Sequence, residues 1–243
     1  MAPKTTGKPD HVNVLIIGAG LSGIGAAAHL RRELPGKTFA VLERRAAMGG
    51  TWDLFRYPGI RSDSDMHTLG YGFRPWESDQ VLADGPSIKE YVEDTADEYG
   101  ITPHLRFEHH VRAANFDSTR RVWTVDFEVD GVAGTITADF LWACSGYYSY
   151  DEPYAPKFPG QEKFSGELVH PQFWPEDLDY SGKSVVVIGS GATAVTLVPA
   201  MTDRAAKVTM LQRSPSYILS IPAKDPLGSL SRKLLPGTLP GIS

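Results

Sequence analysis

The sequence predicts an α/β protein made of two Rossmann-like dinucleotide-binding domains with parallel sheets and an inserted β-meander. Three observations predict this fold class. A short apolar run followed by a glycine-rich turn occurs twice, at residues 12–23 and 185–194. Each turn opens a helical stretch that leads to another apolar run, which is the order of a βαβ unit. Between the two units, residues 121–138 alternate apolar and polar side chains as antiparallel strands do.

The first unit begins with the β-branched run at residues 12–17, which suits a strand buried on both faces of a parallel sheet. The fingerprint glycines follow at once, and a helix is expected from about Ser22 to Leu34. Gly18 permits the tight turn, Gly20 lets the backbone approach a pyrophosphate, and Gly23 lets helix and strand pack closely. The free N–H groups at the start of the helix attract phosphate.

A second strand is expected at residues 39–42, and Glu43 lies at its tip. An acid at about this offset from the fingerprint binds free ribose hydroxyls and disfavours a 2′-phosphate. The first unit is therefore predicted to bind FAD or NAD rather than NADP. Downstream, Gly49 and Gly50 allow close backbone approach, and Trp52 offers a flat apolar face.

The middle of the chain is predicted to hold one helix and the β-meander. Ser87 and Glu90 form a capping box at the start of that helix, and Gly100 is a natural stop. Strands are expected at residues 121–129 and 132–138, joined by an Asp-Gly turn, and an apolar strand at 140–143 runs into a small-residue turn at 144–146. His109 and His110 have no third ligand at convincing spacing, so no metal site is predicted.

The second unit repeats the pattern with a different strand tip. Residues 185–188 read as another buried strand, and the fingerprint Gly-x-Gly-x-x-Ala follows at 189–194. The next strand, at 208–211, is followed by Gln212, Arg213 and Ser214. An arginine there accommodates a ribose 2′-phosphate by charge-assisted hydrogen bonds, which predicts NADP at this unit. Pro199 should kink or end the helix between the strands unless it lies near the end of that helix.

Composition excludes several classes of protein. The chain has 243 residues, of which 42% are hydrophobic, so it can bury the cores of one large or two modest domains. A net charge of −5 lacks the basic excess that nucleic-acid binding needs. No apolar run approaches the ~20 residues of a membrane span, so no integral membrane segment is expected. Cys144 is the single cysteine, which excludes an internal disulfide and favours the cytoplasm.

The stretch FSGELVHPQFWP, from Phe164 to Pro175, lies between the two fingerprints. Its spacing resembles the signature of Baeyer–Villiger-type flavin monooxygenases. GGTW at residues 49–52 and RYPGIRSDSDMHTLGYGFRPW at 56–76 are similar to the subgroup that includes the thioamide-prodrug-activating monooxygenases. The resemblance covers essentially the whole chain, but only the N-terminal half of such enzymes.

The resemblance implies that FAD and NADPH are the cofactors. Hydride passes from NADPH to the flavin, and a peroxyflavin then oxygenates a ketone or a sulfur compound with O2. By motif position, the residues that would hold FAD are Gly18, Gly20, Ser22, Gly23, Glu43, Thr51, Trp52, Asp53, Leu54, Asp63 and Val111. Those bordering the nicotinamide would be Arg61, Ser62 and Asp63. Those holding the rest of NADPH would be Gly189, Ser190, Gly191, Ala192, Thr193, Ala194, Val195, Thr196, Arg213 and Ser214.

Two residues are the candidates for a role in the reaction itself. Asp63, beside an arginine, is expected to stay ionised and to orient that arginine. His170, in the signature, is expected to hold the junction between the domains and to couple nicotinamide binding to domain rotation.

Two alternatives remain open on the sequence. One is another two-dinucleotide flavoenzyme, such as an N-hydroxylating monooxygenase; a disulfide reductase is disfavoured because Cys144 has no partner cysteine. The other is a truncated, non-catalytic nucleotide-binding fragment.

The predicted domain organisation has four parts. Residues 1–11 are a flexible tail, 12–155 an FAD-binding domain, 156–182 a linker that carries the signature, and 183–243 an NADP-binding domain. Both domains are expected to be incomplete, because the family fold continues into a C-terminal part that this chain lacks. The sequence predicts no particular oligomeric state.

Overall fold

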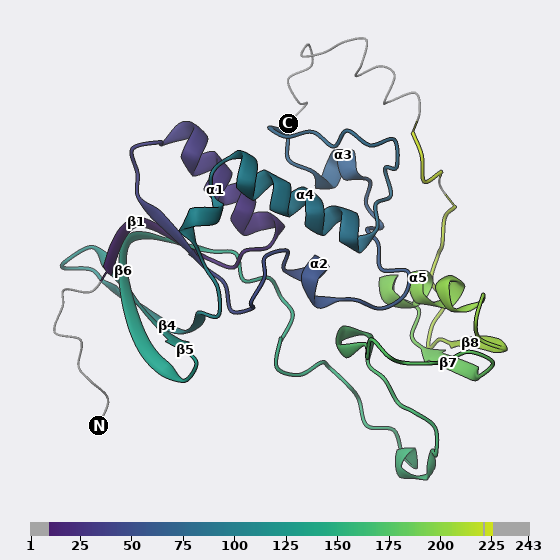
Figure 1. Ribbon diagram of the computed structural model, residues 1–243. Helices are drawn as coiled ribbons and strands as arrows, with labels where there is room; N and C mark the ends of the chain where they lie inside the picture. The colour runs from purple at the N-terminus through teal and green to yellow at the C-terminus, as the bar shows by residue number, and fades with distance from the viewer. Residues whose placement is uncertain (1–9, 221, 226–243) are drawn as a thin grey trace. The chain divides into compact units, whose positions relative to one another are not determined.

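The computed structural model describes residues 10–220 and 222–225, which fall into two compact units (Figure 1). The first unit comprises residues 1–53 and 89–147, and the second comprises 54–88 and 148–243. These units differ from the predicted domain spans. Residues 54–88 belong to the second unit because Leu54, Phe55 and Tyr57 pack in its apolar core. Tyr180, in the predicted linker, is buried in the same core, so the linker also contributes to packing.

A mixed six-stranded sheet forms the first unit, in the order β3-β2-β1-β6-β5-β4. The strands β3, β2, β1 and β6 are parallel, and β6, β5 and β4 are antiparallel. The parallel part around β1 confirms the predicted Rossmann-like α/β fold. The strand bounds are β1 Asp10–Ile17, β2 Phe39–Leu42, β3 Leu105–Arg106, β4 His110–Asp117, β5 Val122–Val129 and β6 Val132–Ala143.

Two strand predictions need correction. The meander is not a separate insertion, because β6 is one continuous strand where the sequence predicted two. Its first part pairs with β5 and its second part, from Ile136 to Ala143, pairs with β1. The strand continues without a break because residues 136–138 pair with β1 and β5 at once. Asp10 and His11, which were predicted to lie in a flexible tail, pair with Ile136 and Thr137 in the sheet. The rest of the predicted tail, residues 1–9, lies outside the described residues.

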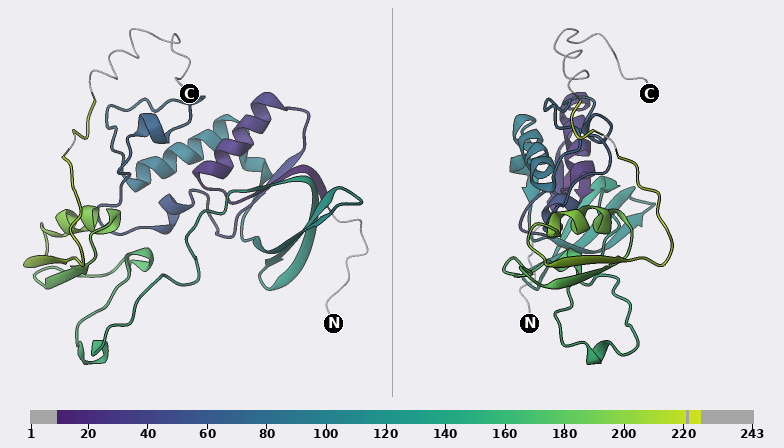
Figure 2. Two further views of the ribbon diagram at one scale, coloured as in Figure 1. Left: turned by 180° about the vertical axis from the view of Figure 1, so that it is seen from behind. Right: turned by 90° about the vertical axis from the view of Figure 1, so that its right-hand side faces the viewer.

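Helix α1 (Leu21–Glu33) packs against β1 and β2, and α4 (Gly85–Glu98) lies beside it (Figures 1 and 2). The predicted capping box on α4 is wrong. The helix begins at Gly85, and the Asp84 carboxylate accepts a hydrogen bond from the Ser87 backbone N–H at 2.8 Å. Asp84 precedes the helix and can turn its carboxylate back toward the first-turn N–H groups, whereas Ser87 is already helical. Gly100 ends this segment as predicted, at φ +62°.

The second unit contains a parallel pair, β7 (Ser184–Ile188) and β8 (Lys207–Leu211), joined by α5 (Ala192–Met201). Pro199 lies in the last turn of α5, where it breaks little of the helix. Short helices complete the described chain: α2 Thr51–Leu54, α3 Met66–Leu69, η1 Thr102–His104, η2 Gln161–Lys163 and η3 Pro171–Phe173.

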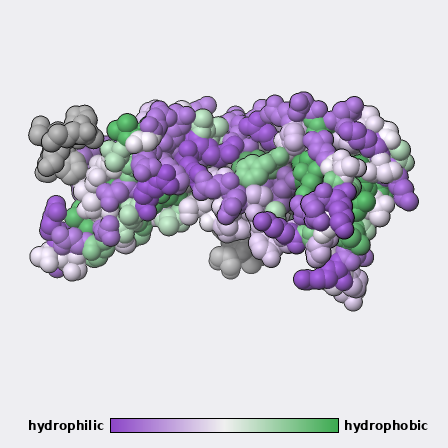
Figure 3. All heavy atoms as spheres, turned by 90° about the horizontal axis from the view of Figure 1, so that it is seen from below, coloured by the Kyte–Doolittle hydropathy of each residue, from purple (hydrophilic) through white to green (hydrophobic). Residues whose placement is uncertain are grey.

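The second strand pair is not buried on both faces as predicted. Val185, Val187 and Val208 pack into the core of the unit. The alternate side chains are exposed, with Val186 at 59%, Ile188 at 53% and Leu211 at 56%. Seen from below, apolar atoms reach the surface among polar ones (Figure 3). In the described residues, no helix is both long and apolar enough to cross a bilayer.

Candidate dinucleotide-binding sites

The first glycine turn is packed so closely that two of its glycines, Gly18 and Gly23, cannot carry side chains. Gly18 has φ +101°, and a Cβ there would lie 2.4 Å from the Cys144 carbonyl oxygen at the end of β6. A Cβ on Gly23 would lie 1.8 Å from the carbonyl oxygen of Gly18. The Gly18 N–H donates to the Leu42 carbonyl at 2.8 Å. The turn is therefore fixed between β2, β6 and the first turn of α1.

The N-cap residue of α1 makes no side-chain hydrogen bond to the helix. Gly20 is the N-cap, in an extended conformation, and within the described chain no side chain caps the helix and no acid lies in its first turn. Such a terminus carries partial positive charge and donors that suit a phosphate group. This arrangement is the one that the fingerprint predicted.

Glu43 lies beside this turn as a buried carboxylate, 3% exposed. One of its oxygens accepts from the Ala19 backbone N–H at 2.8 Å, and the other accepts from the Arg45 N–H at 2.9 Å. These bonds hold the acid at the tip of β2, against the glycine turn. A carboxylate accepts about four hydrogen bonds, so Glu43 keeps acceptor capacity for hydroxyl groups.

The Gly49–Gly50 turn comes back onto the first fingerprint. The Gly49 N–H donates to the Ala19 carbonyl at 2.9 Å. Gly50 has φ +57°, and a Cβ there would lie 2.9 Å from the Cα of Gly20. Thr51 and Trp52 follow on α2 and stay partly exposed. The structure thus unites motifs that lie some thirty residues apart in the sequence.

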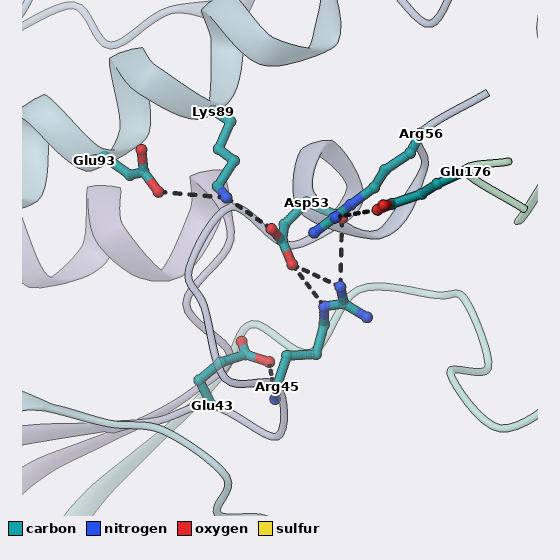
Figure 4. Close-up of polar contacts among 7 residues, drawn as sticks. All are labelled: Glu43, Arg45, Asp53, Arg56, Lys89, Glu93 and Glu176. Atoms are coloured by element: carbon teal, nitrogen blue, oxygen red, sulfur yellow. Dashed lines mark hydrogen bonds and ion pairs between the residues drawn. The ribbon is translucent and has the colours of Figure 1, made fainter. Parts of the chain in front are cut away.

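The side chain of Asp53 does not point to an open surface. It is 2% exposed, and its carboxylate binds the guanidinium of Arg45 and the ammonium of Lys89 (Figure 4). Neither cation was among the predicted site residues. The only local sign of this cluster is the spacing of Lys89 and Glu93, which are an i,i+4 pair 3.6 Å apart.

In the second unit, Arg61 and Asp63 flank the buried Ser62 and are themselves exposed. The Ser62 hydroxyl donates to the Ser64 carbonyl at 2.7 Å. Among the described residues, Asp63 has no ion pair with Arg61, so the expected orienting contact is not formed. The predicted FAD residue Leu54 is buried in the core of this unit.

The second fingerprint has the same backbone conformation and hydrogen bond as the first, but few described atoms pack against its glycines. The Gly189 N–H donates to the Leu211 carbonyl at 2.8 Å, as Gly18 does to Leu42. Gly191 is the extended N-cap of α5, again without a side-chain cap in the described chain. Of the predicted residues in this helix, Ala194 and Thr196 are buried, and the Thr196 hydroxyl lies 3.3 Å from the Tyr57 hydroxyl.

The segment after β8 is exposed and lies next to the second glycine turn. Arg213 and Ser214 are both exposed. The Ser190 hydroxyl donates to the Ser214 carbonyl at 3.4 Å and accepts from the Ser216 hydroxyl at 2.9 Å. These bonds hold the segment that carries Arg213 against the fingerprint that a nucleotide would occupy.

His170 has a local structural role. Its Nδ1 accepts from the Gln172 backbone N–H at 3.2 Å, at the start of η3. Gln172 is buried, and its amide donates to the Ser149 carbonyl at 2.6 Å. Partial burial lowers the pKa of His170 from its ordinary 6.5, which favours the neutral imidazole that this acceptor role requires.

Val111 lies in β4 opposite Phe127 and is half-buried, next to a register shift in the β4–β5 ladder. No group of three or more potential metal ligands occurs in the residues described.

A chain with two strand–glycine turn–helix units of this geometry is a two-dinucleotide protein of the Rossmann class. Residues 78–227 match the flavin-binding monooxygenase-like family, and residues 16–82 match an NAD(P)-binding Rossmann-like domain. The chain belongs to the flavin-binding monooxygenase-like family. This confirms the resemblance that the sequence motifs predicted.

Among curated relatives, the chain is 56% identical over 231 residues to "FAD-containing monooxygenase EthA" of Mycobacterium tuberculosis (strain CDC 1551 / Oshkosh), a match that covers 95% of this chain and 47% of the relative. It is 59% identical over 233 residues to "Putative FAD-containing monooxygenase MymA" of the same strain, covering 93% and 47%. The chain therefore spans about half the length of the curated relatives it matches.

Solved structures of a steroid monooxygenase and of cyclohexanone monooxygenase have the same fold over this region. A steroid monooxygenase bound to NADP matches with a TM-score of 0.78 and 32% identity, over 92% of this chain and 42% of that one. An open cyclohexanone monooxygenase matches with a TM-score of 0.80 and 28% identity, over 93% and 44%.

Proposed function

We propose that this chain provides the FAD and NADPH sites of a monooxygenase that oxygenates ketones or sulfur compounds. The observation that carries the proposal is the pair of glycine turns, each opening a helix without a side-chain cap and each followed by a different strand tip. The first tip is the buried acid Glu43, and the second carries Gln212 and Arg213. Relatives described as FAD-containing monooxygenases, and solved structures described as bound to NADP, support it.

The first unit fits FAD. The glycine turn of residues 18–23 opens α1, and at the N-terminus of that helix a pyrophosphate is favoured by backbone N–H donors and by the helix dipole. Glu43 would accept hydrogen bonds from the ribose hydroxyls, while a 2′-phosphate would meet a buried negative charge. Thr51 and Trp52 would line the neighbouring part of the cofactor, and Val111 would contact the adenine through its backbone.

The second unit fits NADPH. Gln212 occupies the position of Glu43, so no carboxylate at that point repels a 2′-phosphate. Arg213, exposed beside the glycine turn, would bind that phosphate by charge-assisted hydrogen bonds, with Ser214 next to it. Arg61, Ser62 and Asp63 would border the nicotinamide, and Asp63 would turn to Arg61 on loading.

When bound, NADPH supplies a hydride to the flavin, and the reduced flavin uses O2 to place one oxygen atom in the substrate and one in water. His170 acts by position, because its Nδ1 accepts the hydrogen bond that keeps η3 and the buried Gln172 in place. A protonated imidazole could not accept this hydrogen bond. Ketones are proposed as substrates because solved relatives include a cyclohexanone-bound monooxygenase. The single Cys144 supports a cytoplasmic location.

The test is to purify the 243-residue chain and record its flavin absorbance, then to follow NADPH oxidation with cyclohexanone or a simple sulfide. A yellow protein that bleaches under NADPH and converts the substrate supports the proposal. A yellow protein that binds NADPH without turnover limits the function to cofactor binding. A colourless protein that binds neither nucleotide overturns it.

A further inference from the structure

Asp53 carries a buried carboxylate, which needs positively charged or hydrogen-bonding partners. A charge removed from water is costly unless it is paired and hydrogen-bonded. Arg45 binds one carboxylate oxygen twice, through Nε at 2.9 Å and through Nη2 at 2.6 Å. The Nζ of Lys89 lies 2.8 Å from the other oxygen. Both cation heads point at the carboxylate, and both side chains are only partly exposed (Figure 4).

The balance of interactions favours the charged cluster. Burial alone would raise the pKa of Asp53. Hydrogen bonds from Lys89 and Arg45, together with their positive charges, outweigh burial and hold the pKa below its ordinary value. The hydrogen bond to Asp53 raises the pKa of Lys89 in turn. Asp53 and Lys89 therefore stay ionised at neutral pH.

The cluster ties together three segments, of which only α4 is distant from the others in the sequence. Arg45 follows the tip of β2, Asp53 lies on α2, and Lys89 lies on α4. The Arg45 backbone N–H also donates to Glu43, the acid of the first unit, and its guanidinium reaches the Asp53 carbonyl at 3.3 Å. One carboxylate thus joins the ribose acid, the α2 turn and α4.

The Gly49–Gly50 turn lies directly against this cluster. A Cβ on Gly49 would lie 3.2 Å from the Cβ of Asp53 and 3.2 Å from the Cγ of Lys89. On its other side, the turn donates from Gly49 to Ala19 and touches Gly20 through Gly50. Hydrogen bonds therefore join Asp53 to the turn, through its N–H to the Gly50 carbonyl at 3.1 Å, and the turn to the first fingerprint.

We propose that Asp53, which Arg45 and Lys89 hold in place, is a positioning residue. It keeps the Gly49–Gly50 turn against the first glycine fingerprint and so shapes the FAD site. Its side chain does not contact the cofactor. This inference rests on the proposed function. It assigns a role to Arg45 and Lys89, and it gives Asp53 an indirect role in place of direct contact.

Lys89→Met is the sharpest test, because it removes one cation from a partly exposed position and leaves Asp53 with Arg45. FAD and NADPH dissociation constants are measured for the full chain by fluorescence titration, well below the melting temperature of each variant. We expect FAD to bind about tenfold more weakly, with NADPH within about twofold of the parent; tenfold corresponds to about 1.4 kcal/mol. Lys89→Arg should restore most of the FAD affinity.

Hydrogen exchange of the Gly49 amide in the protein without nucleotide supplies a readout that does not depend on FAD. This amide should exchange faster in Lys89→Met, because the turn loses part of its support. Glu93→Gln is the matched control: it removes the other partner of Lys89, is exposed, and should change neither FAD affinity nor exchange. Asp53→Asn should show the same pattern more strongly.

The outcomes separate the two proposals. If the parent chain binds FAD and Lys89→Met binds it equally well, the positioning role is overturned and the proposed function stands. If Lys89→Met weakens FAD and NADPH alike while Gly49 exchange is unchanged, the cluster only stabilises the fold, and the inference is again overturned. If the parent chain binds no FAD, the proposed function itself fails, and the inference fails with it.

Discussion

The glycine turn at Gly18 and the glycine turn at Gly189 end the same kind of strand and donate the same hydrogen bond to the neighbouring strand. Their surroundings differ. In the first unit, a Cβ on Gly18 or Gly23 would strike backbone atoms of the protein itself. In the second, no described atom lies within 4 Å of a Cβ built on Gly189 or Gly191. Packing therefore requires glycine in the first unit, whereas in the second unit only the backbone conformation of Gly189, at φ +132°, requires it.

The strands of the two units differ in the same way. All of β2 is buried, whereas residues in β7 and β8 alternate between half-buried and exposed. The shared hydrogen bond aligns Leu42 with Leu211, and so Glu43 with Gln212 and Arg44 with Arg213. Both tips thus carry an arginine at one position. The two tips differ in the residue before that arginine, which is the buried acid Glu43 in the first unit and Gln212 in the second.

The largest effect is expected from Gly23→Ala. Its methyl group would overlap the Gly18 carbonyl, and because backbone atoms cannot move aside cheaply, the free energy of unfolding should fall by about 3 kcal/mol or more. Gly191→Ala, in open space at φ −79°, should cost less than about 1 kcal/mol. Urea unfolding followed by circular dichroism measures both. Equal losses would contradict the contrast between the two units.

Asp53→Asn tests the ion cluster of Arg45, Asp53 and Lys89. Among the described residues, this cluster lies near the first glycine turn and has no counterpart near the second. At pH 7 it should lower the free energy of unfolding by about 3 kcal/mol, because two partly buried cations lose their counter-charge. The folded pKa of Asp53 lies below its ordinary 3.8. Its contribution is therefore complete above that value and is lost as pH falls through the folded pKa.

Urea unfolding of both proteins between pH 7 and pH 3 should accordingly show two curves that converge on acidification. A gap that stays constant down to pH 3 would mean that Asp53 is not held ionised by Arg45 and Lys89.

Arg213→Ala tests the second strand tip. Loss of a charge-assisted contact should raise the dissociation constant of NADPH by about 10- to 100-fold, and that of NADH far less. Titration of both nucleotides gives the ratio. Arg44→Ala, the aligned arginine of the first unit, should leave NADPH binding unchanged. Similar effects on NADPH and NADH would remove Arg213 as the residue that selects the 2′-phosphate.

The smallest effect is expected from His170→Ala. Without the acceptor at Nδ1, η3 loosens, and stability should fall by about 1 kcal/mol. NADPH-driven oxygenation should slow by about tenfold with FAD still bound, because the segment acts by position. Turnover with a ketone, together with the flavin spectrum, separates these readouts. Unchanged turnover would leave His170 as a local cap only.

Much of the fold followed from patterns that are local in the sequence. Both fingerprints, the two strands of each unit and the acid at Glu43 could be predicted because a buried strand, a glycine turn and a helix start each need particular residues at short spacing. The capping of α4 could not, because Asp84 and Ser87 are both plausible caps and only the observed start of the helix decides. The continuity of β6 could not either, because it depends on two different partner strands.

The sequence by itself determined the family, the two nucleotide units and the chemical difference between their strand tips. Only the tertiary structure decided that Asp53 faces Arg45 and Lys89, that the Gly49–Gly50 turn rests on Gly20, and that one face of β7 and β8 stays exposed. The physical reason is range. Turn conformation and strand periodicity are set by neighbours along the chain, whereas the partners of a buried charge and the covering of a sheet face are set by segments that only folding brings together.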